Sequence, residues 1–217
     1  MGGGMFFYSS PNVNLSANRV LGNAANPTLG SGGGVWVDSG SSFVMVNNVV
    51  AGNRAGGYGG GLGAGANETE PVAGILLHNT FVANNAGSAN GQVGIYLASA
   101  WINLELVNNL FSTHSYGLCA AGGTATLNRT LFYANSSGDI CPGGSVVNTD
   151  PFSGYDPRLD ATYHLRAGSA AIDWGIEAGV TEDIDGDARP IGAGYDIGAD
   201  EYTEPHRVFL PVALKAR

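Results

Sequence analysis

Apolar residues and uncharged asparagines follow one fixed pattern in five stretches between residues 15 and 135, of which FVMVNNVVAGN at 43–53 is the clearest. The pattern is apolar-x-x-Asn-x-apolar-x-x-Asn. Its first asparagine position reads Asn18, Asn48, Asn79, Asn109 and Thr130, at spacings of 30, 31, 30 and 21 residues. Its last position reads Asn23, Asn53, Asn84, His114 and Asn135. Repeats of this length indicate a solenoid, in which each coil of chain stacks on the next.

Stacked β-strands explain why asparagine stands among apolar residues. Strands of successive coils pair in parallel about 4.8 Å apart, so each inward amide meets the amides above and below it and can hydrogen bond to both. Asparagine also tolerates the left-handed backbone of a sharp corner. The sequence therefore predicts an all-β fold, a right-handed parallel β-helix, over 1–149, with the hand taken from the general preference of crossover connections. The alternative is a set of unrelated asparagine-rich loops.

A short apolar run follows a glycine where each coil begins, as in MFF at 5–7, VWV at 35–37 and IYL at 95–97. Period-two alternation turns the middle residue of each run outward. Phe6, Trp36 and Tyr96 are then expected in one outward line, together with Gly63 and Cys119. Exposed rings can stack on sugars, so the three aromatic residues are the predicted substrate-binding residues. The alternative is that a loop or preceding chain covers them.

The two cysteines, Cys119 and Cys141, align one short coil apart, at a separation of 22 residues. Stacked neighbours in a parallel sheet lie close enough for a disulfide, which we therefore expect, with two buried free thiols as the alternative. A disulfide would indicate an oxidising, extracellular or cell-surface location.

Composition narrows the choice of partners. Only 12% of residues are charged and the formal net charge is −9, which disfavours nucleic acid and anionic membrane surfaces. No apolar run approaches the roughly 18–20 residues of a transmembrane span. The glycines at 2–4 resemble those at 32–34 that begin a coil. We therefore expect a piece of a longer exported protein, and a monomer.

The chain changes character near residue 149. All nineteen asparagines lie at or before Asn148, while the acidic residues rise from five in 1–149 to thirteen in 150–217. We expect coils over 1–149 and a closing segment over 150–204 that caps the open end of the solenoid. The apolar-basic tail at 205–217 is either an edge strand or a surface-attachment signal.

About 55 residues of the C-terminal part resemble a known module. The matching elements are Asp150-Pro151-Phe152, Tyr163-His164-Leu165, Ser169, Ile172-Asp173 with Gly175, Asp185-Gly186-Asp187 with Arg189-Pro190, and Asp196-Ile197-Gly198-Ala199 with Glu201. In this order they resemble the choice-of-anchor Q type of domain, which follows pectate-lyase-like β-helices in secreted bacterial proteins. The resemblance implies export, surface association and a glycan groove on the face of the first strands. It implies no particular reaction, because such helices serve many functions.

Catalytic groups are scarce in the predicted coils. A polysaccharide lyase of this fold would use a lysine or arginine base beside calcium-binding acids, but the one lysine is Lys215, in the tail. A glycoside hydrolase needs clustered carboxylates. The weak candidates are Asp38, Glu105 and Arg54, and their convergence in one groove would favour an enzyme.

Acidic residues alternate in EDIDGDA at 182–188, where Asp183, Asp185 and Asp187 have the i, i+2, i+4 spacing of calcium-loop acids. Gly186 departs from the EF-hand pattern, since it takes the fourth position instead of the sixth. The three acids are candidate calcium ligands, and no other cofactor is expected. Alternatively, they cap turns or pair with Arg189.

Two classes of function remain open. The first, which the scarcity of catalytic groups favours, is a non-catalytic secreted or cell-surface protein that binds polysaccharide or cell-wall glycan, or serves as a scaffold. The second is a polysaccharide lyase or glycoside hydrolase of the pectate-lyase-like type.

Overall fold

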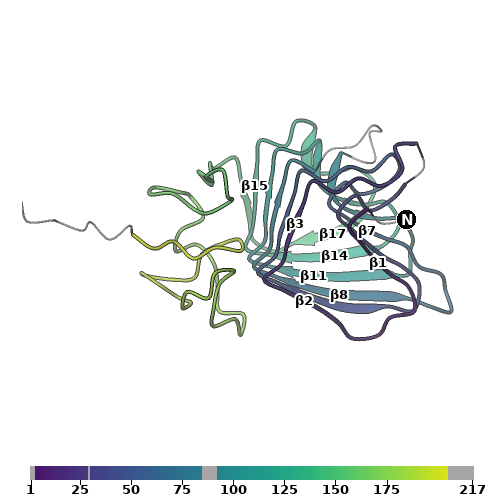
Figure 1. Cartoon of the computed structure of the whole chain (residues 1–217), viewed down its shortest axis with the longest axis horizontal. Helices are drawn as coiled ribbons and strands as arrows, with labels where there is room; N and C mark the ends of the chain where they lie inside the picture. The colour runs from purple at the N-terminus through teal and green to yellow at the C-terminus, as the bar shows by residue number, and fades with distance from the viewer. Residues whose placement is uncertain (1–2, 29, 85–91, 205–217) are drawn as a thin grey trace, which may run out of the picture.

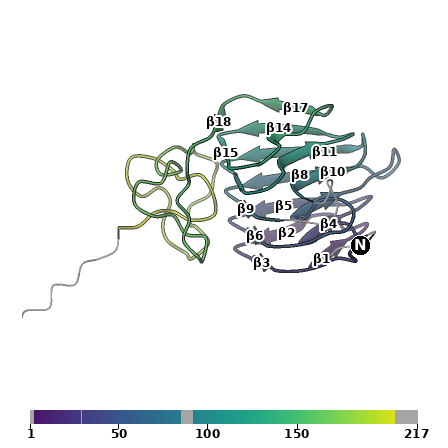
Figure 2. The same cartoon turned by 90° about the horizontal axis from the view of Figure 1, so that it is seen from above.

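The described part of the chain forms three parallel β-sheets wound into one solenoid, as Figure 1 and Figure 2 show. The structure, a computed structural model, describes residues 3–28, 30–84 and 92–204. Each sheet takes every third strand, so one coil contributes one strand to each sheet. The predicted parallel β-helix is confirmed. The described residues form no helix, and so none that is long and apolar enough to cross a membrane.

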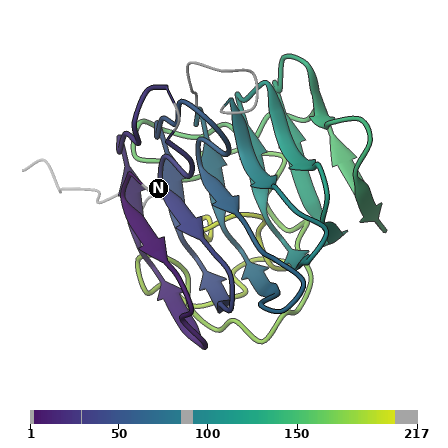
Figure 3. The same ribbon diagram turned by 90° about the vertical axis from the view of Figure 1, so that its right-hand side faces the viewer.

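Within the described residues, six strands make up each sheet, and the strands of successive coils lie side by side in chain order, from purple to green in Figure 3. Sheet A contains β1 (Met5–Phe7), β4 (Val35–Val37), β7 (Leu62–Ala64), β10 (Val93–Leu97), β13 (Tyr116–Ala120) and β16 (Gly138–Ile140). Sheet B contains β2 (Val13–Ser16), β5 (Ser42–Val46), β8 (Val72–Leu77), β11 (Ile102–Val107), β14 (Thr124–Asn128) and β17 (Ser145–Asn148). Sheet C contains β3 (Arg19–Leu21), β6 (Val49–Ala51), β9 (Thr80–Val82), β12 (Leu110–Ser112), β15 (Thr130–Tyr133) and β18 (Pro151–Ser153).

The core consists of columns in which like residues lie over like. In sheet C, Phe81, Phe111 and Phe132 are in register and fully buried. Their rings stack, with centroids 4.9 Å apart in the first pair and 5.3 Å in the second. Burying each ring stabilises the fold by about 1.5–3 kcal/mol. The repeat spacing thus sets the register, because a slip of one residue would turn each ring out of the core.

The first asparagine column forms a hydrogen-bonded ladder at the corner between sheets B and C. The Nδ2 of Asn48 donates to Oδ1 of Asn79 at 2.9 Å, and that of Asn79 donates to Oδ1 of Asn109 at 3.0 Å. Each Nδ2 also donates to a backbone carbonyl of the preceding coil, as from Asn48 to Leu15 at 2.8 Å. The ladder therefore satisfies amides that carry no accessible surface, which is the condition for burying them.

The left-handed residue at this corner is the one before each ladder position, not the ladder asparagine as the sequence suggested. Positive φ angles of 48–56° occur in this column at Ala17, Asn47, His78, Asn108 and Arg129. The ladder residue itself points its side chain inward to stack on the next coil. The residue before it therefore adopts the left-handed backbone that turns the chain at the corner.

The second column contains a histidine that must stay neutral. Asn84 Nδ2 lies 3.2 Å from His114 Nε2, and His114 Nδ1 lies 3.3 Å from Asn135 Oδ1. Because Nδ2 is a donor and Oδ1 an acceptor, Nε2 accepts and Nδ1 carries the proton. A second proton on Nε2 would face the Asn84 amide group. Burial lowers the pKa of His114 to about 4, although the hydrogen bond to Asn135 opposes this.

We expect His114→Asn to make the protein less sensitive to acid. A pKa lowered in the folded state contributes stability above the unfolded value of about 6.5, and this stability is lost as pH falls through the folded value. The loss is about 1.4 kcal/mol per pH unit. Urea unfolding of both proteins from pH 7 to pH 4 should show the variant gaining about 3 kcal/mol relative to the parent. A constant difference across this range would contradict the assignment.

The C-terminal segment, residues 154–204, lies along the flank of the solenoid beside β3 and β15 (Figure 1). On the outer face of sheet C, Leu110 and Leu131 pack against Leu165, Ala171 and Ile197. The residues that precede the ladder positions add polar contacts to the segment. Asn108 Nδ2, for example, donates to the carbonyl of Ile176 at 2.7 Å.

This position corrects the expectation that the segment closes an end of the solenoid. Sheet C carries apolar residues on both faces, as in Val49-Val50-Ala51, so its outer face needs a cover. The last strand, β18, ends at Ser153, so the coils extend a few residues beyond 149. The tail at 205–217 lies outside the described residues.

A disulfide joins Cys119 to Cys141, whose Cα atoms are 5.0 Å apart. It lies at sheet A, where Cys119 is in register with Tyr96 and Cys141 directly follows β16. The predicted disulfide is confirmed.

Candidate functional site

The aromatic column on sheet A is in register but is largely covered. Phe6 pairs with Trp36, Trp36 with Gly63, and Gly63 with Tyr96, as the alternation predicted. However, Trp36 and Tyr96 are only 9% exposed, whereas Phe6 is 40% exposed. The expectation of a continuous exposed stripe is therefore wrong for two of its three members.

Local packing explains this burial. A Cβ placed on Gly63 would lie 2.5 Å from the ring of Trp36, which shows how closely the ring lies over this glycine. Trp36 Nε1 donates to Asp38 Oδ2 at 3.1 Å, which fixes the indole. The ring of Tyr58 stacks on Tyr96 with centroids 4.8 Å apart. The loop that contains Tyr58 thus covers Tyr96, which agrees for this residue with the alternative that a loop covers the aromatic residues.

The three weak catalytic candidates lie in different places. Asp38 follows β4, and its carboxylate accepts hydrogen bonds from Trp36 Nε1 and the Ser39 amide. Glu105 is on the outer face of β11. Arg54 follows β6 and bridges to Ala24 at the corner between sheets C and A. No hydrogen bond or ion pair joins any two of these three described residues, and their catalytic role stays a prediction.

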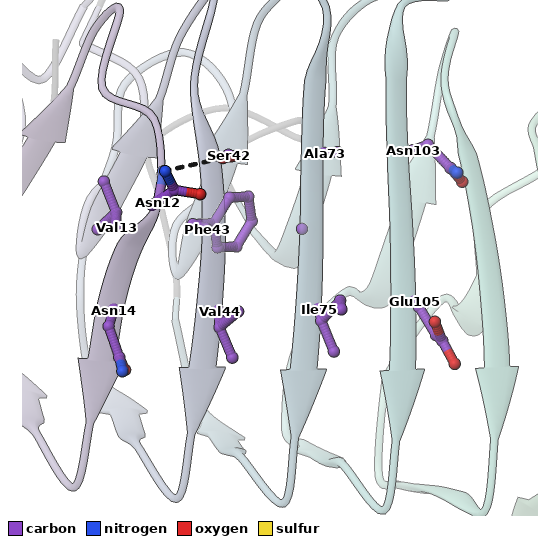
Figure 4. A pocket seen from close by; sticks show the side chains of 11 residues that line it. Asn12, Val13, Asn14, Ser42, Phe43, Val44, Ala73, Ile75, Asn103 and Glu105 are labelled. Atoms are coloured by element: carbon purple, nitrogen blue, oxygen red, sulfur yellow. Dashed lines mark hydrogen bonds between the residues drawn. The ribbon is translucent and has the colours of Figure 1, made fainter.

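A groove of about 450 Å³ crosses the outer face of sheet B, over β2, β5, β8 and β11 (Figure 4). Asn14, Val44, Ile75 and Glu105 form one row across these strands. The row spans three strand spacings, or about 14 Å. A second row along the groove contains Asn12, Ser42, Ala73 and Asn103. The groove therefore has polar ends and an aliphatic middle.

The polar side chains of the groove are largely free to bind a ligand. The side chains of Asn14 and Glu105 are exposed and make no hydrogen bond or ion pair with another described residue. Asn103 uses its Oδ1 to accept from Thr124 at 2.9 Å, which leaves its amide nitrogen available. The groove thus presents amide donors and carboxylate acceptors beside aliphatic surface.

An exposed tryptophan lies in line with the groove. Trp101 is 45% exposed and precedes β11, in which Ile102, Leu104 and Leu106 are buried. Period-two alternation puts Trp101 on the same outward side as Asn103 and Glu105. Sequence reasoning overlooked this residue. The alternation of WINLELV at 101–107 could have revealed it, because every second residue in it is apolar and inward.

The acidic loop at 182–188 does not gather its three carboxylates. Asp183 is buried and caps the turn: its Oδ1 accepts from the amides of Asp185 and Asp187, and its Oδ2 from that of Glu201 at 2.9 Å. Asp185 instead pairs with Arg19 at 3.0 Å. The turn-capping alternative fits this geometry, although the pairing is with Arg19 instead of Arg189. Calcium binding by the three acids stays a prediction.

One cluster of potential metal ligands occurs among the described residues, and it is not the set of three acids predicted from the sequence. Ligand atoms of His164, Asp185 and Asp200 lie within 4.8 Å of one another. The Arg19 guanidinium lies 3.1 Å from His164 Nε2 and supplies the positive charge there. Asp200 accepts from the Leu165 amide at 2.7 Å. The cluster therefore joins the first coil to the C-terminal segment.

Some of the residues that carry the resemblance to an anchor-type domain, among them Arg189, Asp196 and Glu201, form a buried polar centre in that segment. Arg189 Nη1 donates to Glu201 Oε2 at 2.6 Å, and neither side chain is exposed. Asp196 accepts from the amides of Asp173 and Tyr202. Burial raises the pKa of Asp196 to about 7 despite these hydrogen bonds. The motif thus specifies how the segment folds.

Comparison of the chain with protein-family models, with curated proteins and with solved structures found no match. The likeness to pectate-lyase-like helices and to the anchor-type domain therefore rests on the residues themselves. The structure shows the fold, a parallel β-helix with asparagine ladders.

Proposed function

We propose that the protein is a non-catalytic, secreted or cell-surface module that binds polysaccharide along the outer face of sheet B. The groove with its flanking Trp101 carries this proposal. Aliphatic and aromatic surface suits the apolar faces of sugar rings, while the free amide of Asn14 and carboxylate of Glu105 suit their hydroxyls. A groove of about 14 Å along the solenoid axis suits a short stretch of an extended chain.

Binding without cleavage is favoured because the groove contains a single carboxylate. Glycoside hydrolysis uses two carboxyl groups about 5–10 Å apart, and Glu105 has no acidic neighbour in the groove lining. The disulfide supports an oxidising, extracellular compartment. The resemblance of residues 150–201 to an anchor-type domain supports a location at the cell surface.

Calorimetric titration with oligosaccharides from plant and bacterial cell walls tests the proposal. We expect binding without new reducing ends, and we expect Trp101→Ala to weaken it about tenfold, which is about 1.4 kcal/mol. Tyr155→Ala is the matched control, because Tyr155 is 58% exposed but belongs to the C-terminal segment.

Two other results would overturn parts of the proposal. If Phe6→Ala weakens binding and Trp101→Ala does not, the ligand binds to sheet A. If oligosaccharide is shortened during the titration, the protein is an enzyme.

A further inference from the structure

The charge in and beside the groove on sheet B is negative. Glu105 is the single ionisable side chain in its lining, and no described lining residue is cationic. A neighbouring hollow shares Ser42 and Ala73 with the groove and adds a second carboxylate, that of Glu70. A ligand in the groove therefore meets negative charge at one end and along one side.

The arginines of the coils lie away from this face. Arg19 pairs with Asp185 at 3.0 Å, and Arg129 pairs with Asp150 at 2.8 Å. Both therefore contact the chain near or within the C-terminal segment, on the flank of sheet C. Arg54 follows β6 at the corner between sheets C and A. None of the three is available to neutralise a negative ligand on sheet B.

We propose that the groove selects polysaccharides bearing free amino groups over those bearing carboxylates, and that Glu105 sets this preference. The inference rests on the proposed function and names its ligand class. An ammonium group beside Glu105 gains a charge-assisted hydrogen bond. A uronate in the same position meets a like charge with no cation to offset it. An N-acetylated sugar, which is neutral, gains neither effect.

The position of Glu105 suits this role. It ends the row that begins with Asn14, so an ammonium group at one end of an oligosaccharide meets the carboxylate while neutral rings lie over Val44 and Ile75 (Figure 4). The carboxylate is exposed and has no partner among the described residues, so binding an amine breaks no existing ion pair.

Calorimetric titration of the full chain with three oligomers of equal length tests the inference: β-1,4-linked glucosamine, its N-acetylated form and oligogalacturonate. We expect the glucosamine oligomer to bind about tenfold more tightly than the acetylated one, which is about 1.4 kcal/mol, and oligogalacturonate to bind most weakly. The preference should shrink as salt rises from 0.01 M, where the Debye length is about 30 Å, to 0.15 M, where it is about 8 Å.

Glu105→Gln should remove the preference while retaining affinity for the acetylated oligomer. Glu68→Gln is the matched control, because Glu68 carries the same charge on an exposed turn outside the groove lining and should leave the preference unchanged. Equal binding of the amine and acetylated oligomers by the parent protein, or tighter binding of oligogalacturonate, would overturn this inference alone. Failure of the parent to bind any oligosaccharide would overturn the proposed function itself.

Discussion

Replacing Arg189 with methionine is expected to lower the free energy of unfolding by about 3–5 kcal/mol, because it leaves a buried carboxylate without its partner. Arg189 donates to Glu201 at 2.6 Å and to the carbonyl of Gly198 at 2.8 Å. Both ionic side chains are completely buried. Methionine fills a similar volume, so the loss of stability comes from the unpaired carboxylate and carbonyl groups more than from a cavity.

The pH dependence of the stability loss distinguishes an unpaired buried charge from poor packing as its cause. Burial already raises the pKa of Glu201, while its hydrogen bonds and Arg189 lower it. Without Arg189 that pKa rises further. A carboxyl group whose folded pKa is raised contributes stability at low pH that is lost as pH rises through that value. The variant should therefore be less impaired at pH 5 than at pH 8, and an equal loss at both would indicate packing alone.

Arg166→Met provides the control for this experiment. Arg166 is exposed, belongs to the same segment and makes no side-chain hydrogen bond to another described residue. Its replacement should change stability by less than about 0.5 kcal/mol. Urea unfolding followed by tryptophan fluorescence is suitable, because Trp174 lies in the segment and stacks on Phe152 at 4.8 Å.

The sequence was sufficient to predict the coils because their register is one-dimensional. Once Asn48 and Asn79 are aligned, the register of the flanking strands of sheets B and C follows, and the structure pairs Met45 with Leu76 and Val50 with Phe81 as the alignment requires. The disulfide follows from a second alignment, that of the apolar runs that begin each coil, in which Cys119 and Cys141 are 22 residues apart. Repetition supplies the long-range information that a single sequence ordinarily lacks.

Features outside the repeat were harder to predict. The C-terminal segment packs on Leu110 and Leu131, which face outward from strands that already bury a phenylalanine on the other side. Nothing local in the sequence tells whether such a residue faces solvent or another segment. The burial of Trp36 likewise depends on the glycine that the next coil places beneath its ring.

The groove on sheet B was missed for a related reason. Its row of Asn14, Val44, Ile75 and Glu105 has no repeated chemistry, and only the register brings the four together. Glu105 was identified as a candidate from its residue type, but its neighbours were not. To predict a row of outward side chains, the alignment of the coils must be extended to the outward positions. The residue types at these positions vary from coil to coil, because they do not stack in a core.

The second large effect is expected at the middle of the asparagine ladder, where Asn79→Ala should cost about 4 kcal/mol. Asn79 Oδ1 accepts from both the backbone amide and Nδ2 of Asn48, each at 2.9 Å. Its Nδ2 donates to the carbonyl of Met45 and to Asn109 Oδ1. Alanine leaves several of these groups buried without a partner, and each such group costs about 1–3 kcal/mol.

Two other asparagines that differ from Asn79 in burial provide controls for this prediction. Asn18 belongs to the same column in the first coil but is only partly buried, and its Nδ2 donates to Ser16 and Asn48 alone. Asn18→Ala should therefore cost less, since water can reach the groups that it leaves. Asn14→Ala should cost under about 0.5 kcal/mol, because the side chain of Asn14 is exposed and has no partner among the described residues.

Urea unfolding of the three variants should thus rank their losses as Asn79, then Asn18, then Asn14. The order follows from burial in this chain, because the substitution is the same in each case and Asn79 is fully buried, Asn18 partly buried and Asn14 exposed. Equal losses at Asn79 and Asn18 would mean that water enters the gap and replaces the missing amide. In that case the apolar columns would hold the coils together, and the ladder would serve to fix their register.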